Sequence, residues 1–401
     1  MASPSKVIPS YKHQTDTNIT AMGSTGTNTA TIRQDYVPFL EFPSPNQDDS
    51  NRRQCLIYMI PGNPGLVAYY EPFLKTLRQL LDEIEVQQDY NYAYHIYGRN
   101  LIGFEDGDHE PPFGTTTSSG TQTEPFSLDD QINCVCSHLP TVNTSTLTNG
   151  RTFDSVILIG HSVGAYIALE TFHHHHTALL PTPVTTSTKT EHTNPEATPN
   201  PNPALTTVPL RSAILLFPTI THIAQSPSGR QLSLLRTVPL LDRTAHHVAA
   251  AFVRLMPAWA LGGVVRRVLG FPAHAADATL RFLGQREGVW QALHLGKDEM
   301  RCIGEERWGE EFWEVRGLEE RLGEEVKEEE VKGEEGWSKF YFWFAEGDHW
   351  VADRFRDEFI ERRRRHEKGR TTVVVDGSGI PHAFCLREFH CCAPRDGVVA
   401  E

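Results

Sequence analysis

A serine between two glycines lies where the chain changes from an apolar run to helix-forming residues. Residues 156–159 are apolar and mostly β-branched, and they lead directly into Gly160-His161-Ser162-Val163-Gly164. A strand that turns this sharply into a helix leaves no room for a Cβ at the flanking glycines and raises the serine hydroxyl above the sheet edge. The pattern predicts that Ser162 is a nucleophile and that the Val163 N–H faces a developing oxyanion. An ordinary strand–turn–helix corner with a buried serine is the alternative.

A serine nucleophile needs a general base, and His382 is the candidate. Residues 371–375 form an apolar strand pattern, and His382 follows it in the loop 377–384. The chain order nucleophile, acid, histidine is the order found with this type of turn. We expect the other histidines to be surface or packing residues, with His161 packed into the turn. The run at 173–176 is predicted to be loop filler rather than a metal site.

The base in turn needs a carboxylate that orients it, and three acidic residues compete for this position. The aromatic run 340–344 reads as a strand, and Glu346, Asp348 and Asp353 follow it. Loops after strand ends gather at one edge of an open α/β sheet, which favours Asp348 as the acid. Its alternative role is that of an N-cap for the helical segment at 352–364.

A second oxyanion donor is expected from the loop after the first main strand. The sequence Pro61-Gly62-Asn63-Pro64-Gly65 occupies that place. Because Pro64 has no N–H, we expect the donor to be the backbone of Asn63. Asn-Pro and Pro-Gly are also strong turn signals, so a plain turn is the alternative.

The elements that position these residues alternate between strand and helix patterns. This alternation predicts an α/β fold with a mostly parallel central sheet flanked by crossover helices. The predicted strands are 55–60, 92–97, 155–160, 212–217, 339–345 and 371–375, and the predicted helices are 72–85, 127–139 with Ser127 as N-cap, and 165–172.

Three segments depart from that alternation. Residues 1–36 are polar and predicted to be a disordered tail, which leaves 37–401 as one catalytic domain. Residues 177–208 are dense in Thr, Pro and Asn and are predicted to be a disordered insertion. Residues 226–336 are predicted to be a helical cap that ends in an acidic segment, 305–335.

Composition limits the class of protein. The chain has 401 residues and a formal net charge of −14, which argues against nucleic-acid binding. Seven cysteines without metal-like spacing predict a reduced intracellular protein. The N-terminal segment lacks the apolar core of a secretory signal, and no apolar run reaches the ~18 residues of a membrane span. The proposed chemistry requires neither a metal nor an organic cofactor.

Several motifs together resemble the lipid-droplet-associated hydrolase family of the α/β-hydrolase superfamily. They are spread over about residues 55–390, and the later ones are more specific than the serine motif. The motifs are Pro61-Gly62-Asn63-Pro64-Gly65, Tyr69-Tyr70, Phe73-Leu74, Gln131 within 128–132, Gly160-His161-Ser162-Val163-Gly164-Ala165-Tyr166, Leu215-Leu216-Phe217-Pro218-Thr219-Ile220, Ser226-Pro227-Ser228-Gly229-Arg230, Asp348-His349-Trp350 and Ile380-Pro381-His382-Ala383-Phe384.

The resemblance implies an α/β-hydrolase fold with Ser162, Asp348 and His382 as the triad. It also implies a lipase or esterase for stored neutral lipids, such as triacylglycerol or sterol esters, on the cytosolic face of lipid droplets and endoplasmic reticulum. One departure is the loop 98–104, where the family tends to carry Ser-His-x-Gly-His; we expect this loop to line the pocket. The alternatives are a catalytically weak droplet tether on a hydrolase scaffold and a soluble carboxylesterase or thioesterase. The sequence does not indicate an oligomeric state.

The segment 247–271 combines apolar and aromatic residues with arginines, prolines and glycines. Its charges and helix breakers argue against a spanning helix, whereas this composition suits a segment lying in a lipid interface. We therefore expect Phe252, Trp259, Val265 and Leu269 to dock on the phospholipid monolayer of a droplet. A cap that packs on its own core is the alternative.

Overall fold

The computed structural model describes most of the domain and leaves out several segments. The described residues are 39–87, 91–116, 123–144, 151–179, 203–236, 239–313, 339–364 and 371–387. The predicted disordered tail, residues 1–36, lies outside them, as do 180–202 and 314–338.

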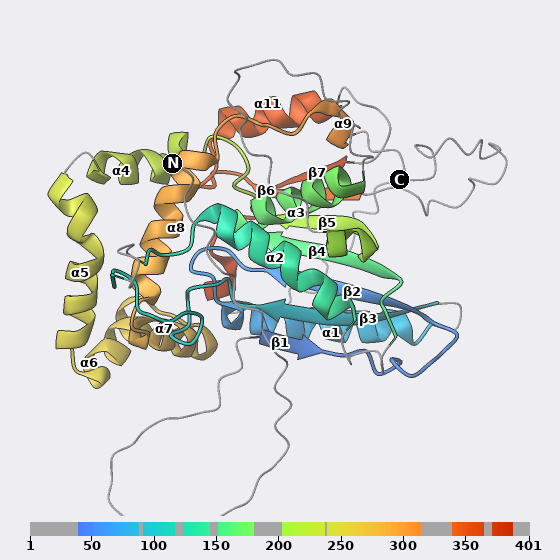
Figure 1. Cartoon of the computed structure of the whole chain (residues 1–401), viewed down its shortest axis with the longest axis horizontal. Coiled ribbons are helices and arrows are strands. Elements are labelled where there is room, and N and C mark those ends of the chain that lie inside the picture. The colour runs from blue at the N-terminus through green and yellow to red at the C-terminus, as the bar shows by residue number, and fades with distance from the viewer. Residues whose placement is uncertain are drawn as a thin grey trace, which may run out of the picture.

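The centre of the molecule is a seven-stranded sheet (Figure 1). Its order is β1-β3-β2-β4-β5-β6-β7, with β1 antiparallel to β3 and every other pair parallel. This topology confirms the predicted mostly parallel α/β sheet. The strands are β1 (Phe39–Phe42), β2 (Arg53–Ile60), β3 (Tyr92–Arg99), β4 (Ser155–His161), β5 (Leu210–Leu216), β6 (Lys339–Ala345) and β7 (Thr371–Asp376).

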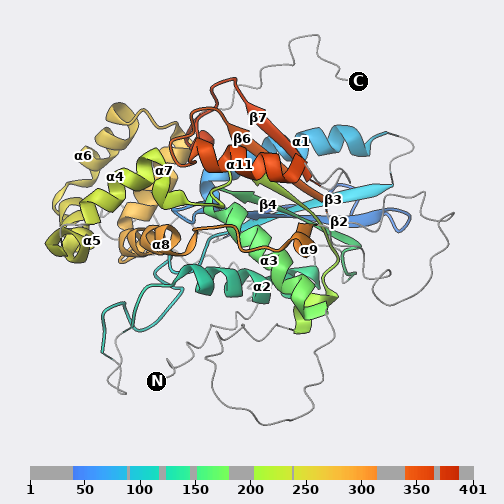
Figure 2. The same ribbon diagram turned by 90° about the horizontal axis from the view of Figure 1, so that it is seen from above.

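Helices cover both faces of the sheet (Figures 1 and 2). Tyr58 and Met59 are neighbours on β2 and so point to opposite faces. The Tyr58 hydroxyl hydrogen-bonds His138 of α2 at 3.0 Å, whereas Met59 and Leu74 of α1 both border Gly98 of β3. The flanking helices are α1 (Glu71–Glu85), α2 (Leu128–Asn143), α3 (Val163–Leu179) and α11 (Asp353–Arg364).

The predicted N-cap of α2 is confirmed. The Ser127 hydroxyl accepts the Asp130 N–H at 3.2 Å, and the Asp130 carboxylate accepts the Ser127 N–H at 2.8 Å. This reciprocal pair is a capping box, which satisfies two N–H groups that a helix start would otherwise leave unpaired. The helix then runs four residues beyond the predicted end at 139, through Pro140.

Between β5 and β6 the chain forms a cap of helices that lies to one side of the sheet (Figure 1). The chain enters loops or turns at the carboxyl ends of β2, β4, β5 and β6. The cap begins after the loop that follows β5. Its elements are α4 (Pro227–Arg236), α5 (Pro239–Leu255), α6 (Ala258–Gly263), the π-helical turn η5 (Val264–Val268), α7 (Ala273–Gly284) and α8 (Gly288–Cys302).

The predicted insertion at 177–208 is wrong at both ends. Residues up to Leu179 complete α3, and a 3-10 turn, η3 (Pro203–Thr207), follows the undescribed stretch. Leu205 and Val208 are buried in the core, which explains why these residues are ordered despite their polar neighbours.

The predicted boundary of the cap is also wrong, because the start of the acidic segment packs on the sheet. A short helix, α9 (Glu310–Trp313), follows the buried Trp308. The Trp313 ring contacts both Phe340 of β6 and Phe359 of α11, with ring centroids 5.5 and 5.7 Å apart. Aromatic residues embedded among the glutamates therefore tie this segment to the core rather than to the cap.

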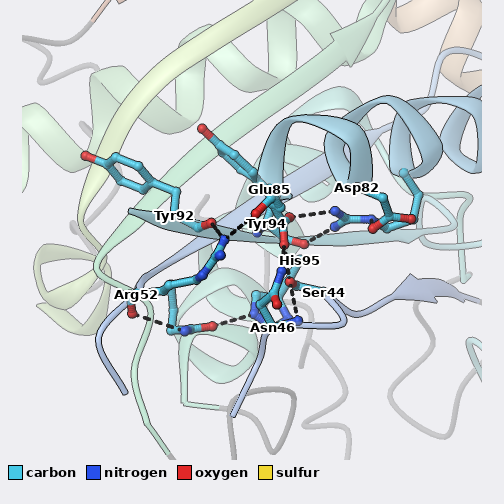
Figure 3. Close-up of polar contacts among 10 residues, drawn as sticks. Ser44, Asn46, Arg52, Asp82, Glu85, Tyr92, Tyr94 and His95 are labelled. Atoms are coloured by element: carbon cyan, nitrogen blue, oxygen red, sulfur yellow. Dashed lines mark hydrogen bonds and ion pairs between the residues drawn. The ribbon is translucent and has the colours of Figure 1, made fainter. Parts of the chain in front are cut away.

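A buried polar cluster lies at the N-terminal end of β3, beside the end of α1 (Figure 3). The Glu85 carboxylate, at the end of α1, accepts hydrogen bonds from Ser44 at 2.5 Å, from the Tyr94 N–H at 2.9 Å, and from Arg78 at 2.5 Å. Burial alone raises the pKa of Glu85, but these hydrogen bonds outweigh it and lower the pKa below its ordinary value. The cluster lies far along the strands from the loops that carry Ser162 and His382.

Candidate active site

The turn between β4 and α3 has the strained geometry that its glycines predict. Ser162 has φ of 55°, a left-handed conformation rare for a residue with a side chain. A Cβ on Gly160 would lie 2.6 Å from the Ala165 Cα, and one on Gly164 would lie 2.7 Å from the Pro61 oxygen. The glycines therefore let the turn close against β2 while Ser162 stays at its apex.

Three side chains from separate loops form one hydrogen-bonded chain. The His382 Nε2 lies 3.0 Å from the Ser162 Oγ, and the His382 Nδ1 lies 2.7 Å from the Asp348 Oδ2. Asp348 and His382 are both buried. Among the three candidate acids the geometry selects Asp348, because Glu346 is exposed and Asp353 forms an ion pair with Arg356 at 2.7 Å.

The loop after β6 fixes the Asp348 carboxylate. Its Oδ1 accepts the Trp350 N–H at 2.9 Å, which leaves Oδ2 for His382. The main-chain oxygen of Asp348 accepts the Val351 N–H at 3.1 Å. Asp348 thus precedes α11 (Asp353–Arg364) in a tight turn, and both carboxylate oxygens have defined partners.

His161 packs beside Ser162, as expected, and also connects the loops of the candidate site. Its Nε2 faces the main-chain oxygen of His382 at 2.9 Å, so this nitrogen carries the proton, and its Nδ1 accepts the Tyr70 hydroxyl at 2.6 Å. Burial lowers the pKa of His161 to about 3 and keeps it neutral, and burial raises the pKa of Tyr70 well above its ordinary value. The Tyr70 oxygen in turn accepts the Gly62 N–H at 2.9 Å.

These hydrogen bonds form a relay from Gly62 through Tyr70 and His161 to the main chain of His382. The relay connects the loop after β2, the serine turn and the histidine loop. Its role was missed from the sequence because Tyr70 and Gly62 are far from His382 along the chain. The one available signal was that His161 and Tyr70 are bulky polar residues next to buried elements.

The two predicted oxyanion donors lie on the loops that meet at Ser162. A Cβ on Gly62 would lie 3.0 Å from the Ser162 Cβ, which shows how closely the loop after β2 approaches the serine. Val163 is the first residue of α3, so its N–H has no partner within the helix. In the described part of the chain, no hydrogen bond is recorded for the N–H of Asn63 either.

Ser162 and His382 open into a cavity of about 520 Å³ beneath the cap. This volume is within the range of pockets that hold small organic ligands. The wall is mainly apolar, and Glu299 and Lys297 of α8 contribute ionisable side chains to it. It includes Pro64, Tyr69, Ile223, Leu232, Ala245, Ala292, Leu293, Met300, Trp350 and Leu386.

The loop 98–104 does not line this cavity, contrary to the expectation. Leu101 and Phe104 are buried in the core, and the Leu101 N–H bonds the Gly65 oxygen at 2.8 Å. The Asn100 side chain accepts the Val67 N–H at 2.8 Å. The loop therefore supports the segment after β2 from behind instead of lining the cavity.

Three of the four predicted docking residues are exposed on the cap, and one is not. Phe252 is 64% exposed, Trp259 81% and Leu269 51%, whereas Val265 is only 1% exposed. Val265 was therefore wrongly assigned to docking, because the π-helical turn η5 points it into the cap. No single described helix has the length and hydropathy to span a membrane; the segments Thr244–Leu255 and Ala258–Val268 meet those limits only together, and they are bent by 105°.

Within the described residues, no three His, Cys, Asp or Glu side chains are grouped so as to hold a metal ion. In the run 173–176, His175 hydrogen-bonds the Val208 oxygen at 3.0 Å and His173 lies 3.9 Å from Glu170. These contacts hold the end of α3, so the prediction of loop filler at 173–176 is wrong: the run is helical.

Comparison with known proteins identifies relatives over most of the chain. The profile of a family described as lipid-droplet associated hydrolase matches residues 53–385. Proteins called lipid droplet-associated hydrolase are 23% identical over 351 residues in Gallus gallus, covering 85% of this chain and 83% of that protein. In Pongo abelii the identity is 26% over 188 residues, covering 46% of this chain.

The match spans 44% of the Pongo abelii protein and 42% of the Homo sapiens protein, less than half of each. Solved structures with a similar arrangement include the peroxisomal alpha-beta-hydrolase Lpx1 from Saccharomyces cerevisiae. It has 12% identity and a TM-score of 0.44, covering 86% of this chain and 75% of that chain. A lipase-esterase related protein from Clostridium acetobutylicum has 10% identity and a TM-score of 0.38, covering 87% and 94%. Likenesses of this degree carry no argument about chemistry.

Proposed function

Because the chain belongs to the lipid-droplet-associated hydrolase family, we propose that it is a serine hydrolase of carboxylic esters. Its proposed substrates are stored neutral lipids such as triacylglycerol or sterol esters. The observation that carries this proposal is the continuous chain from Asp348 through His382 to Ser162, with distances of 2.7 and 3.0 Å. These distances are those expected of an oriented base and an activated nucleophile.

In the proposed reaction, the Ser162 Oγ attacks the ester carbonyl carbon and His382 takes the serine proton at Nε2. Asp348 holds the Nδ1 proton and stabilises the imidazolium. The N–H groups of Val163 and Asn63 would hold the oxyanion. Collapse of the tetrahedral intermediate breaks the bond to the alcohol oxygen, which receives the proton from His382. Water then attacks the acyl-enzyme by the same route and releases the fatty acid.

Labelling with a fluorophosphonate probe tests whether Ser162 is activated. We expect the wild-type protein to be labelled and Ser162→Ala to be unlabelled. Ser378→Ala is the matched control, because Ser378 is exposed and only bonds Asp376 at 2.6 Å. A folded wild-type protein that stays unlabelled, also with a neutral-lipid emulsion present, would favour the alternative of a non-catalytic droplet tether.

An exposed apolar surface on the cap supports binding to a droplet monolayer. This cap patch consists of Val248, Phe252, Leu255, Trp259, Val268 and Leu269, all more than half exposed. The arginines Arg254 and Arg267 are exposed beside it. Aromatic and aliphatic side chains with flanking basic residues suit shallow insertion into a phospholipid surface. We propose that the cap patch holds the protein on droplets and on the cytosolic face of the endoplasmic reticulum.

Flotation with phospholipid-coated droplets tests the cap patch. Burying a large apolar side chain contributes about 1.5 kcal/mol or more, so losing two should weaken binding by roughly a hundredfold or more. We expect this loss for the double variant Phe252→Asp with Trp259→Asp. Val86→Asp is the matched control, because Val86 is 80% exposed but lies at the C-terminal end of α1, outside the cap. Equal flotation of both variants would contradict the docking proposal, and a wild-type protein that does not float would favour the alternative of a soluble esterase.

A further inference from the structure

Glu299 is a carboxyl group inside the catalytic cavity that the proposed reaction does not use. It belongs to α8 of the cap, is only 5% exposed, and lines the same cavity as Ser162 and His382. It is the one acidic residue among the described residues that form the cavity wall. A buried carboxyl in an apolar cavity is costly to keep, so its contacts indicate what it does there.

One oxygen of this carboxyl accepts a hydrogen bond from Asn63, in the loop after β2. The Asn63 Nδ2 donates to the Glu299 Oε1 at 3.0 Å and to the Ala292 oxygen at 2.9 Å, so both amide protons are used. The contact connects the cap to the residue whose N–H is the proposed second oxyanion donor. Because Asn63 donates to Oε1, a proton on the carboxyl resides on Oε2. Within the described residues, Oε2 forms no hydrogen bond.

The surroundings of Glu299 favour its neutral form. Burial raises the pKa of Glu299 to about 8; the hydrogen bond from Asn63 opposes the rise, and the neighbouring charge of Asp298 adds to it. No ion pair of Glu299 occurs in the part of the chain that the structure describes. The other titratable side chains on the cavity wall are Tyr69, Tyr70, His161, Lys297, His382 and Cys385.

We propose that Glu299 serves the ester hydrolase proposed above as an uncharged acid that positions Asn63 through Oε1 and donates a hydrogen bond from Oε2 to an oxygen atom of the bound ester. The group gives up no proton during the reaction. Ionisation removes the Oε2 donor and places a negative charge beside the site where the oxyanion forms. Both effects raise the energy of the transition state more than that of the bound ester, so kcat falls more than KM rises.

The pH dependence of hydrolysis separates this role from a purely structural one. We expect wild-type kcat for an uncharged ester to fall about tenfold from pH 7 to pH 9, as an acid with a pKa of about 8 ionises. Glu299→Gln keeps both an acceptor for Asn63 and a donor in place of Oε2, and it stays neutral. Whatever its rate at pH 7, its kcat should change less than twofold over this range.

The pKa values of neighbouring groups and a control variant allow the fall in kcat between pH 7 and pH 9 to be assigned to Glu299. Burial raises the pKa values of Tyr69 and Cys385 to about 12, so these groups do not ionise below pH 9. Glu346→Gln is the matched control, since Glu346 is an exposed carboxyl on the Asp348 loop; it should keep the wild-type fall. Difference infrared spectroscopy provides a second readout, because the carbonyl band of a protonated carboxylic acid should disappear between pH 7 and pH 9 in the wild type and be missing from E299Q.

The outcomes distinguish this inference from the function on which it rests. A flat wild-type profile from pH 7 to pH 9 overturns the inference without any variant, and so does an equal fall in E299Q. In both cases hydrolysis that depends on Ser162 still supports the proposed function. If the wild type shows no hydrolysis above Ser162→Ala at any pH, the proposed function fails and the role of Glu299 fails with it.

Discussion

Replacing Asp348 with asparagine should leave the site's shape intact and remove most of its activity. Both oxygens of the Asp348 carboxylate are used: Oδ1 accepts the Trp350 N–H at 2.9 Å and Oδ2 faces the His382 Nδ1 at 2.7 Å. Asparagine has one oxygen. If that oxygen stays on Trp350, its NH₂ group faces His382, and the ring must carry its proton on Nε2. A ring protonated there cannot accept the proton of Ser162.

The magnitude follows from this conflict. Turning the amide to restore the His382 bond leaves the Trp350 N–H unpaired, which costs about 1–3 kcal/mol and alone lowers the active population by roughly 5- to 150-fold. Loss of the negative charge that stabilises the imidazolium adds to this. In Ser-His-Asp enzymes the same substitution lowers kcat by about 10⁴, or about 5.4 kcal/mol. We expect Asp348→Asn to lose 10³- to 10⁴-fold in kcat.

Steady-state hydrolysis of a soluble uncharged ester measures kcat and KM for the variant, and urea unfolding checks that the fold is retained. Glu346→Gln and Asp353→Asn are matched controls, because both residues lie near Asp348 in the sequence and neither is part of the hydrogen-bonded chain. We expect both controls to stay within twofold of the wild type. A kcat for Asp348→Asn within tenfold of the wild type would refute the assignment, and a large loss in Glu346→Gln would identify a different acid.

Two further predictions concern the buried polar contacts. Tyr70→Phe leaves the Gly62 N–H and the His161 Nδ1 without their partner, so urea unfolding should show a free energy of unfolding lower by about 2–6 kcal/mol, at roughly 1–3 kcal/mol for each group; a loss under 1 kcal/mol would contradict the relay. Glu85→Gln removes the buried charge partner of Arg78 and leaves it only the half-exposed Asp82, so it should cost roughly 1.5–3 kcal/mol at pH 7, as for a hydrogen bond to a charged group. Because folding lowers the pKa of Glu85 below 4.5, the wild-type advantage should hold above about pH 4.5 and shrink as the pH falls further; an advantage that instead shrinks between pH 7 and 5 would contradict this reasoning.

The central sheet and the serine turn could be predicted because their signals are local. β6 begins and ends at the predicted residues, Lys339–Ala345, because a short aromatic run bounded by polar segments is typical of a buried strand. The turn at Ser162 depends on two glycines within two residues of it. In contrast, β1 was not predicted; it has four residues at the sheet edge, three of them partly buried, and only its pairing with β3 makes it a strand.

Burial on the cap could not be predicted from residue type. Val265 and Trp259 are both apolar and six residues apart, yet one is 1% and the other 81% exposed. The break at Pro257 and the π-helical turn interrupt the helical period of this segment, so the sequence does not indicate which of its sides faces inward. The same holds for Trp308: the glutamates around it suggest a surface position, but the side chain is buried and packs on Tyr166 of α3 and Phe312 of α9.

The chemistry of the cavity depends on contacts that join residues more than 200 positions apart. Asn63 and Glu299 are 236 residues apart, and His161 and His382 are 221 apart, so neither pair has any signal in a single sequence. A sequence motif can place a nucleophile, since the backbone turn is encoded beside it. The protonation of a cavity acid depends instead on which loop the cap helix covers and on the water it excludes. Substrate preference and pH range are therefore properties of how the cap packs on the sheet, and variants at the cap–loop contact should change them while the serine turn stays the same.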